Sequence, residues 1–404
     1  MRRLPNKSSG VQCLLLMLII TPFVLLWGEI FTRVLLPQDV DARLNIFVSD
    51  PVTGFSYKPG ARTFEKGQEY NALYQINSQG LRDREYSEKK DHVFRVLLVG
   101  DSFSVSHGLA IEDSLSRQME KSLQEIIDLD GLPLKIEVIN TAHGGYSPYN
   151  YWKGYRRWAP VYRPDAVVVG LSPDDFDCSN ENSQYLIEEG ETLATFKIGQ
   201  PSPPRKNAGK LIISLRKWLS WNSEFYILMR NYLYYNDIIG RIKLLALAQG
   251  EEQISLIQQF LVPQTQSMNE AWLKSFSYLR KLKGDAESDG VPMVLIPIPL
   301  KMEVDPKELQ RSAQSLSLKP EQIDVNQPLR QITEFCKKEK IPLLDPRQAI
   351  RKRHKDVPCY FIYDGHWVAE GIRVAAASIA RQWRNMRLPP WSNTYTGTQS
   401  KKVN

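Results

Sequence analysis

Two kinds of segment alternate along most of the chain: short apolar runs and longer amphipathic stretches. The runs are rich in branched residues and are typical of strands buried on both faces. They are Phe94–Val99, Leu134–Asn140, Ala166–Leu171, Pro292–Pro299 and Ile341–Leu344. Apolar residues at helical spacing lie between and after them, as in the series Leu115, Met119, Leu123 and Ile126. Strands alternating with helices predict a parallel sheet with helices on both faces, in one α/β domain over residues 91–386.

Three regions fall outside this alternation. Residues 32–90 are rich in turns and predict an extended preamble packed on the main domain. Residues 180–290 predict a helical insertion, in which polar residues such as Arg230 and Asp237 argue against a second membrane span. Residues 387–404 have the composition of a flexible tail.

The N-terminus contains a long uncharged segment. Arg2, Arg3 and Lys7 precede Val11–Gly28, and the stretch 11–31 is long enough, at ~1.5 Å per residue, to cross a hydrocarbon core. The basic residues before it predict that residues 1–10 are cytoplasmic and that the rest lies outside. A cleaved signal peptide is the alternative, although no small-residue cleavage site follows the apolar core. We therefore expect an uncleaved, single-pass anchor.

Composition and charge narrow the classes of function. Of 404 residues, 42% are hydrophobic and 24% are charged, which is typical of a globular protein. The net charge of +7 is spread along the chain except for the run 351–355, so we expect no nucleic-acid partner. The cysteines lack the short spacing of a metal site, and we expect neither a metal nor another cofactor.

Ser102 lies directly after the first predicted strand, in the tripeptide Gly100-Asp101-Ser102. Ligands of an open parallel sheet bind outside the carboxyl ends of its strands, and this is where the tripeptide falls. An ordinary turn would use the same residue types. A serine becomes a nucleophile only when a base removes its proton, so the question is which histidine lies within reach.

His366 is the best candidate for that base. Asp364 precedes it by two residues, and side chains at positions i and i+2 of an extended segment project to the same side. The carboxylate could therefore hold the imidazole and stabilise its charged form. The alternative is a helix-capping aspartate beside a structural histidine. We expect two other histidines to be solvated, His92 and His354. Two more lie in loops and stay open as candidates, His107 and His143.

Two further loops leave the same edge of the sheet. In the loop after the second strand, the backbone N–H of Gly144 or Gly145 could donate to an oxyanion, unless both are ordinary loop glycines. After the third strand, Asp174 and Asp175 could bind a metal ion or a polar substrate, or cap the following turn.

These segments, in this order, resemble the blocks of the SGNH hydrolases, which are GDSL-type serine esterases and acetylhydrolases with a flavodoxin-like α/β/α fold. Gly100–Ser102 is similar to the nucleophile block, Gly145 to the second block, and Asp364 with His366 to the last block. The preamble motif INSQGLRD is similar to that of bacterial membrane-anchored members. The resemblance implies that Ser102 attacks an acyl carbonyl, that His366 transfers the proton and that Asp364 orients it. It also implies an oxyanion hole formed by the N–H groups of Ser102 and Gly145.

Two positions depart from the family pattern. The last block reads D-x-H in place of the usual D-x-x-H, which is similar to the branch that contains alginate-type O-acetyltransferases. Asp174 stands where the family has an oxyanion-binding asparagine, and an ionised carboxylate accepts hydrogen bonds but cannot donate them. Loss of one oxyanion donor typically costs ~10²–10³ in rate.

Near these last two blocks, Cys178 and Cys359 lie on loops at the active edge, and we expect a disulfide between them if the domain is exported.

The resemblance implies an ester hydrolase or O-acyltransferase that works through an acyl-serine outside the bacterial cytoplasmic membrane. The expected substrate is an O-acyl group, chiefly O-acetyl, on an envelope or exported glycan, or a small ester. Aromatic residues expected near the active edge fit a glycan; they are Tyr146, Tyr149, Trp152 and Trp367. Besides the membrane, we expect envelope polysaccharide assembly proteins as partners. The alternative is a noncatalytic glycan-binding or assembly protein in which Asp174 marks a decayed site.

Overall fold

The computed structural model forms two compact units. The first comprises Met1–Ala42 and Pro201–Glu252, and the second comprises Arg43–Gln200 and Gln253–Asn404. Within them, the structure describes residues 7–36, 46–67, 69–176, 183–186, 194–197, 215, 218–219, 222–235, 256–315 and 318–392.

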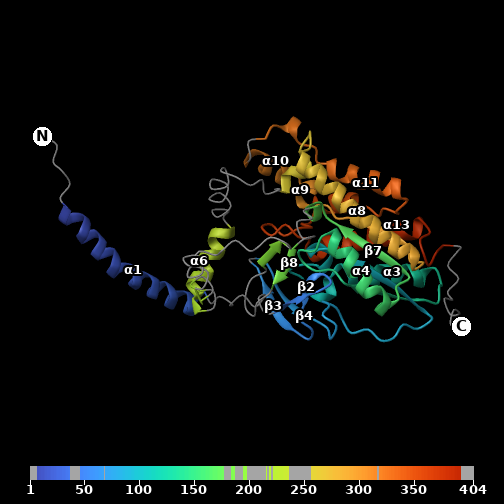
Figure 1. Ribbon diagram of the computed structural model, residues 1–404, viewed down its shortest axis with the longest axis horizontal. Coiled ribbons are helices and arrows are strands. Elements are labelled where there is room, and N and C mark those ends of the chain that lie inside the picture. Colours follow the sequence, from blue (N-terminus) through green and yellow to red (C-terminus); the bar gives the residue numbers. More distant parts are fainter. Residues whose placement is uncertain are drawn as a thin grey trace. The chain divides into compact units, whose positions relative to one another are not determined.

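A four-stranded parallel sheet forms the centre of the second unit (Figure 1). Its strands are β5 (Val93–Val99), β6 (Lys135–Asn140), β7 (Ala166–Leu171) and β10 (Met293–Pro297). They lie in the order β10-β7-β5-β6. The fifth predicted strand is reduced to a single parallel bridge between Leu343 and Leu295 beside β10. The reason is the proline at position 342, which has no N–H to give to a strand ladder. With that bridge at the edge, the order is that of a flavodoxin-like sheet.

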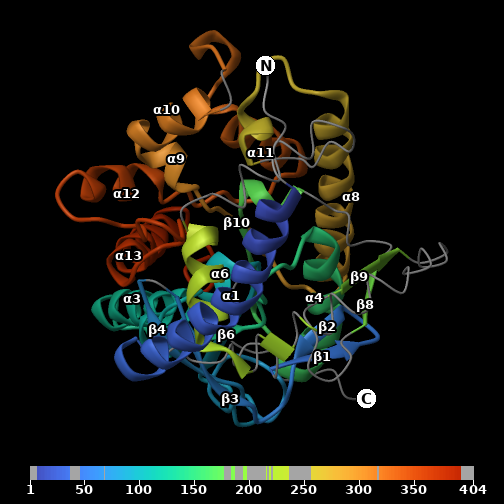
Figure 2. The same cartoon turned by 90° about the vertical axis from the view of Figure 1, so that its left-hand side faces the viewer.

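Helices cover both faces of this sheet (Figure 2). On one side lie α3 (Leu115–Leu129) and α13 (Ala369–Asn385), and on the other lie α4 (Pro148–Tyr162), α8 (Gln266–Ser288) and α11 (Gln327–Glu339). Alternate residues of each strand project to opposite faces. In β5, Val96 and Leu98 therefore pack toward the first layer, whereas Leu97 and Val99 pack toward the second. The predicted three-layer α/β fold is confirmed.

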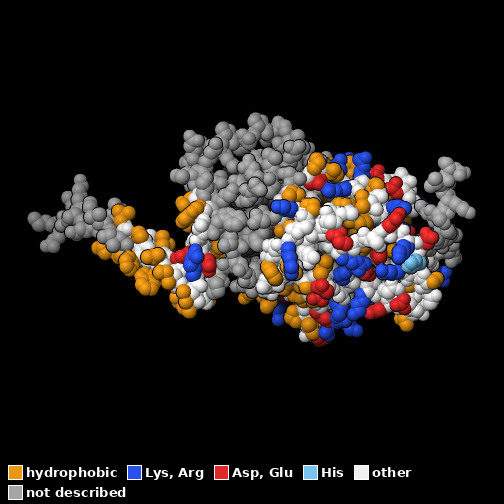
Figure 3. Space-filling view, turned by 90° about the horizontal axis from the view of Figure 1, so that it is seen from below, with side chains coloured by type: hydrophobic (Ala, Val, Ile, Leu, Met, Phe, Trp, Pro, Cys, Tyr) orange, Lys and Arg blue, Asp and Glu red, His pale blue; other side chains and the backbone are white. Residues whose placement is uncertain are grey.

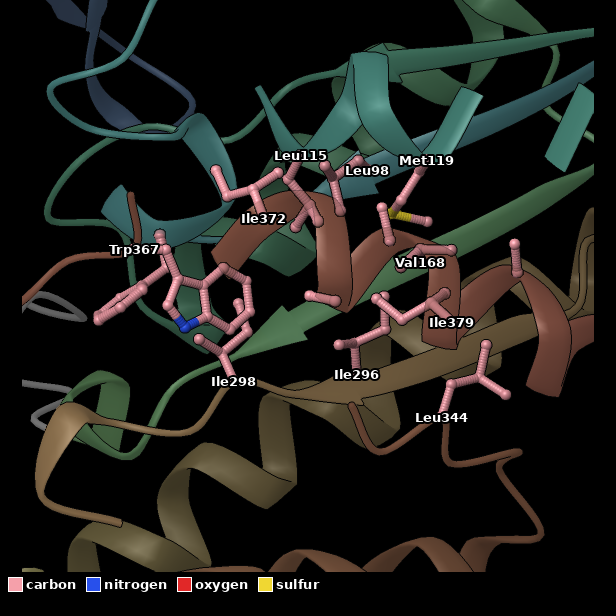
Figure 4. Packing of buried hydrophobic residues seen from close by; sticks show 14 of the residues in the cluster. Leu98, Leu115, Met119, Val168, Ile296, Ile298, Leu344, Trp367, Ile372 and Ile379 are labelled. Atoms are coloured by element: carbon pink, nitrogen blue, oxygen red, sulfur yellow. The ribbon is translucent and has the colours of Figure 1, made fainter. Parts of the chain in front are cut away.

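The core under α3 and α13 reaches the carboxyl edge of the sheet (Figure 4). Leu115 and Met119 of α3 and Ile372 and Ile379 of α13 contact the strands from one side. Trp367, which directly follows the candidate base, is only 2% exposed and belongs to the same cluster. The loop that carries the candidate base is thus fixed to the core by its neighbouring indole.

Shorter elements complete the second unit. The helices are α2 (Ser102–Val105), α9 (Lys301–Val304), α10 (Pro306–Ser315) and α12 (Arg347–His354). Antiparallel hairpins pair β1 (Phe47–Asp50) with β2 (Gly54–Tyr57), β3 (Arg62–Lys66) with β4 (Asn71–Gln75), and β8 (Ser183–Leu186) with β9 (Ala194–Lys197).

The preamble packs on the loops at the carboxyl edge of the sheet. Its apolar residues, among them Tyr57 and Tyr74, form one cluster with Val105 and Ala142. These two residues lie in the segments that follow β5 and β6. Arg82 donates to the carbonyl oxygens of Val105 (2.6 Å) and Ser106 (3.0 Å), which end the short helix α2. The preamble therefore supports the loops on which the candidate site is built.

The insertion is shorter than the sequence predicts. Helix α8, which falls within residues 180–290, buries Trp272, Leu279 and Leu282 against the sheet. Thr265 caps it by accepting a hydrogen bond from the N–H of Met268, so the core resumes there. The amphipathic pattern of α8 does not differ from that of an insertion helix, which is why the sequence did not separate them. Most of the rest of the predicted insertion lies outside the described residues.

The described part of the first unit contains helices α1 (Lys7–Leu35) and α6 (Glu224–Tyr235). The window Leu16–Leu35 of α1 is long and apolar enough to cross a membrane, and Figure 3 shows hydrophobic side chains along this helix. The helix extends beyond the predicted stretch 11–31 at both ends, and it includes the charged Glu29. Its carboxylate accepts hydrogen bonds from the N–H groups of Glu224 (3.0 Å) and Phe225 (3.1 Å). A carboxylate there complements the positive N-terminal end of α6.

Two surface segments are better packed than the sequence predicts. In the basic run, Arg351 donates to the carbonyl oxygen of Glu303 (2.6 Å) and Arg353 pairs with Glu370. In the tail, Trp391 donates through its indole N–H to Asp130 (2.8 Å). The rest of the tail, residues 393–404, lies outside the described residues.

Candidate active site

Ser102 begins α2 at the carboxyl end of β5. Asp101 caps this short helix by accepting hydrogen bonds from the N–H groups of Phe103 (3.1 Å) and Ser104 (3.3 Å). The tight turn requires Gly100, because a Cβ there would lie 2.0 Å from the Ser104 hydroxyl and 3.0 Å from the Gly170 carbonyl oxygen. The strand-to-helix turn therefore holds the Ser102 hydroxyl at the sheet edge.

The structure brings together the three residues that the sequence singled out. His366 Nε2 lies 2.7 Å from the Ser102 hydroxyl oxygen, and His366 Nδ1 lies 2.5 Å from Asp364 Oδ1. The imidazole also packs on the ring of Phe103, with ring centroids 4.5 Å apart. These contacts form a continuous hydrogen-bonded path from carboxylate to hydroxyl, which is the arrangement that activates a serine.

Electrostatics at the site favour an ionised carboxylate and a basic imidazole. Burial alone would raise the pKa of Asp364, but the hydrogen bond and positive charge of His366 outweigh it and lower the pKa to about 2. Burial alone would lower the pKa of His366, but the bond to Asp364 and its negative charge outweigh it and raise the pKa. The charges of Asp101 and Asp174 act in the same direction. Asp364 is therefore ionised across the physiological range.

His143 has a structural role. Its ring is stacked between Tyr57 and Tyr146, with centroids 4.3 Å and 4.5 Å away. Burial lowers its pKa to about 4, so it stays neutral in the core.

His354, which was expected to be solvated, accepts a hydrogen bond from the N–H of Cys359 (3.0 Å). Neither histidine belongs to the chain of contacts that reaches Ser102.

A carboxylate from the preamble fixes the D-x-H loop. Glu69 accepts hydrogen bonds from three successive backbone N–H groups, those of Ile362 (2.6 Å), Tyr363 (2.7 Å) and Asp364 (3.1 Å). Three converging N–H donors form an anion-binding nest. No local pattern in the sequence predicts this contact, because Glu69 lies 295 residues before Asp364.

The two loop glycines differ in their surroundings. A Cβ on Gly144 would lie 3.8 Å from the Ser102 Cβ, whereas a Cβ on Gly145 would face Phe55 at 3.8 Å. The backbone of Gly144 forms a hydrogen bond with the Tyr57 hydroxyl. Gly145 has a φ of +81°, a conformation that other residues rarely adopt. Both glycines line the loop beside the nucleophile, and the role of Gly145 in an oxyanion hole stays a prediction.

Asp174 belongs to a cluster of three carboxyl groups with Asp101 and Asp175, which offer oxygen atoms within 4.8 Å of one another. Asp175 accepts a hydrogen bond from the N–H of Ser172 (2.7 Å), and the Ser172 hydroxyl donates to Asp174. Burial and the charge of Asp174 raise the pKa of Asp101 to about 7. Burial and both neighbouring carboxylates raise the pKa of Asp175. The cluster therefore retains protons at pH values where isolated carboxyl groups are fully ionised.

Among the described residues, two groups have the chemistry of metal ligands: this carboxyl cluster, and His107 with Asp364 and His366. In the second group, the imidazole of His366 already bonds Asp364 and Ser102 through its two nitrogens. That use of both nitrogens fits acid–base chemistry better than metal ligation.

Several sequence expectations change at this edge. Tyr146 and Trp367 are buried, and only Tyr149 and Trp152 of the proposed glycan-facing aromatics keep partial exposure. Cys359 is a free, buried thiol in the structure, which argues against a disulfide from it, and Cys178 lies outside the described residues.

Comparisons with known proteins bear on the fold and on the family. Residues 259–402 match the family described as "SGNH hydrolase-like domain, acetyltransferase AlgX". This match agrees with the resemblance that the sequence pattern indicated, and the matched part contains Asp364 and His366 but not Ser102. The expected class of enzyme, a serine esterase or O-acetyltransferase, agrees with this family. A comparison with curated proteins gave no significant match.

Solved structures with similar folds include esterases. The crystal structure of TesA is 12% identical, with 72% of this chain and 99% of that chain covered and a TM-score of 0.36. A catalytic mutant of the acetylxylan esterase Axe2 from Geobacillus stearothermophilus is 11% identical, with 72% and 93% covered and a TM-score of 0.39. The esterase EstA from Pseudoalteromonas sp. is 12% identical, with 72% and 98% covered and a TM-score of 0.34.

Proposed function

We propose that the chain is a serine-dependent ester hydrolase or O-acyltransferase that forms an acyl intermediate on Ser102. The observation that carries this proposal is the hydrogen-bonded path from Asp364 through His366 to the Ser102 hydroxyl, with contacts of 2.5 Å and 2.7 Å. The family match over residues 259–402, whose description names an acetyltransferase, supports the same chemistry.

In the first half-reaction, the Ser102 oxygen attacks the acyl carbonyl while His366 Nε2 takes the hydroxyl proton. The tetrahedral intermediate expels the alcohol, which receives that proton from the imidazolium. Asp364 holds Nδ1–H and stabilises the charge on the ring. In the second half-reaction, water or an acceptor hydroxyl gives its proton to His366 and attacks the acyl-serine, so the acyl group leaves and Ser102 recovers its proton.

The oxyanion of each tetrahedral intermediate needs donors at this edge. The N–H of Ser102, at the start of α2, and the N–H of Gly145 are our candidates. The carboxyl group of Asp174 would serve only in its protonated form.

We further propose that the donor or acceptor is an O-acetylated glycan of the cell envelope or of an exported polysaccharide. This part rests on the family's description and on the half-exposed Tyr149 and Trp152. Through α1 as a single-pass anchor, with the N-terminus inside, the catalytic unit would work outside the bacterial cytoplasmic membrane, beside proteins of polysaccharide assembly.

Turnover of p-nitrophenyl acetate by the full-length chain tests the proposal, with Ser102→Ala as the variant. We expect the rate to fall by about 10³-fold or more in Ser102→Ala, and a fluorophosphonate probe to label only the parent. Equal rates and equal labelling would instead favour a noncatalytic, glycan-binding component.

A second measurement separates hydrolysis from transfer. Products formed from the same donor are analysed by mass spectrometry with and without an oligosaccharide acceptor. A transferase gives an acetylated oligosaccharide, whereas a hydrolase gives only acetate at the same rate in both mixtures.

A further inference from the structure

Asp364 uses its two carboxylate oxygens differently. Oδ1 lies against Nδ1 of the His366 imidazole, as described above. The same oxygen accepts a hydrogen bond from the backbone N–H of His366 at 3.3 Å. Oδ2 faces away from that ring and accepts a hydrogen bond from the Tyr70 hydroxyl at 3.3 Å. His107 Nε2 lies 3.7 Å from the same oxygen. The outer oxygen thus has partners of its own, and they come from segments far from Asp364 in the sequence.

The contacts continue beyond Asp364 in a chain. The Tyr70 hydroxyl lies 2.8 Å from His107 Nε2, and His107 Nδ1 lies 3.2 Å from Glu65 Oε1. Glu65 is 5% exposed, so its carboxylate is buried beside the ring. These contacts form one series that ends at the nucleophile. It runs from Glu65 through His107, Tyr70 and Asp364 to the candidate base.

Counting protons identifies the state in which every contact of this series is a hydrogen bond. The Tyr70 hydroxyl has one proton, and if it goes to Asp364, the oxygen must accept from His107 Nε2–H. A carboxylate on Glu65 likewise requires an N–H on Nδ1. Both N–H groups exist together only in the imidazolium form of His107. A neutral ring would lose either its hydrogen bond to Glu65 or the hydrogen bond to Tyr70 that leaves the tyrosine proton for Asp364.

The backbone makes room for this series. Gly108 has a φ of +74°, and a Cβ there would lie 2.8 Å from the Tyr70 ring. Its N–H donates to Glu65 Oε2 at 3.3 Å. The Tyr70 ring also packs on Phe361, with centroids 5.2 Å apart. A larger residue at position 108 would displace the tyrosine, so the close approach is built into the loop after α2.

We propose that Tyr70, His107 and Glu65 form a second relay that positions Asp364 for catalysis. The inference rests on the function proposed above, because it assigns positioning residues to the same site. Tyr70 and His107 hold Oδ2, which turns Oδ1 toward the imidazole of the base and keeps the tautomer with Nδ1–H. Among the described residues, the charged or titratable groups that face His107 include Glu65, Tyr70, Asp364 and His366.

The direction of the pH effect follows from the charges. The imidazolium of His107 lies 4.7 Å, centroid to centroid, from the His366 ring, and it also stabilises the Asp364 carboxylate. Removing this charge makes protonation of His366 easier. Activity that depends on neutral His366 then appears only at higher pH.

The experiment compares Tyr70→Phe, His107→Gln and the double variant in the full-length chain. We expect kcat for p-nitrophenyl acetate to fall about tenfold in each single variant, the effect of one lost hydrogen bond, with KM changed less than twofold. The acidic limb of the kcat/KM profile should move up by about half a pH unit or more. Because both residues act through Asp364, the double variant should be no worse than about the poorer single variant. His92→Gln, an exposed histidine before β5, is the control and should match the parent.

A spectroscopic readout separates this proposal from the proposed function. The titration of ring-labelled His366, followed by NMR in a Ser102→Ala background, should move to higher pH in Tyr70→Phe and His107→Gln. An unchanged titration with an unchanged pH profile overturns the relay, even if Ser102 is the nucleophile. A shifted titration with no Ser102-dependent turnover supports the relay and rejects the enzyme activity. Near-ultraviolet circular dichroism shows whether each variant is folded. If His107→Gln fails to fold, Tyr70→Phe still tests the relay, because it removes only one oxygen atom.

Discussion

At the scale of single residues, we expect Asp174 to determine how well the site can stabilise an oxyanion. Its carboxyl group shares a cluster with Asp101 and Asp175, and its charge raises the pKa of His366. An ionised Asp174 therefore opposes catalysis twice: it repels the developing oxyanion, and it keeps the base protonated to higher pH. A neutral donor of the same shape would remove both effects.

We predict that Asp174→Asn increases kcat/KM at pH 8 about tenfold or more, since one oxyanion donor is typically worth ~10²–10³ in rate. Loss of the negative charge lowers the pKa of His366, so the acidic limb of the profile should move to lower pH. Rates of p-nitrophenyl acetate cleavage across pH 5–9 measure both. Asp128→Asn, an exposed change on α3, is the matched control. A folded Asp174→Asn variant with a lower rate would mean that the acid itself acts in the reaction.

The triad residues could be predicted because each lies on a local motif at a place that the sheet order determines. Ser102 directly follows a strand, and Asp364 and His366 lie two residues apart, so short-range spacing was enough. Glu69 and Tyr70 could not be predicted, since they reach Asp364 across 295 and 294 residues. No pattern in their own hairpin distinguishes a functional carboxylate from one that only contacts solvent.

At the scale of elements, the turn from β5 into α2 is the strictest part of the site. A methyl group at Gly100 would lie 2.0 Å from the Ser104 hydroxyl and 3.0 Å from a backbone oxygen of β7, and the backbone cannot yield as a flexible side chain can. The start of α2 would have to move away from the sheet, and Ser102 with it.

We predict that Gly100→Ala lowers the rate at least about a hundredfold or destabilises the chain by roughly 1–3 kcal/mol, the usual cost of overpacking. Gly284→Ala is the matched control, since this glycine is exposed in helix α8 and nothing lies within 4 Å of the added methyl group. There we expect a gain of about 0.5–1 kcal/mol from helix propensity. Urea unfolding and ester turnover measure both variants, and equal effects would refute the steric argument.

The preamble hairpin of β3 and β4 is an element whose role the sequence did not reveal. The pattern predicted a small packed segment, and the hairpin in fact supplies Glu69 and Tyr70 to the D-x-H loop and Glu65 to His107. We predict that Glu69→Ala, which removes the acceptor of three N–H groups, lowers kcat about tenfold to a hundredfold with a smaller effect on KM. Glu69→Gln keeps one acceptor oxygen and should recover part of the loss. Kinetics in which only KM changes would assign Glu69 to substrate binding instead.

At the scale of the whole molecule, prediction succeeded for the sheet and failed at the boundaries. Buried parallel strands have a composition of their own, so four of the five predicted strands are present and in the expected order. The stretch at 341–344 forms only a bridge because of its proline. Helix α8 was assigned to the insertion because the sequence of an amphipathic helix does not show against which part of the protein the helix packs.

Whether the chain is anchored depends on α1, whose window Leu16–Leu35 spans 20 residues. At ~1.5 Å per residue this is about 30 Å, the thickness of a hydrocarbon core. Glu29 and Arg33, near its end, form an ion pair at 2.7 Å, and Glu29 also accepts from the start of α6. A charge with such partners tolerates a place at the edge of a bilayer better than a lone carboxylate does.

We therefore predict that the chain expressed in a Gram-negative bacterium stays in the membrane fraction after carbonate extraction and keeps its N-terminus. External protease on spheroplasts should digest the second unit, because the basic residues before α1 retain the N-terminus inside. A matched variant that lacks residues 1–35, fused to a cleavable signal peptide, should be soluble and still label with fluorophosphonate. A parent chain recovered in the soluble fraction, with a mature N-terminus beyond residue 28, would show that α1 is a cleaved signal sequence. The catalytic unit would then act without a membrane anchor of its own.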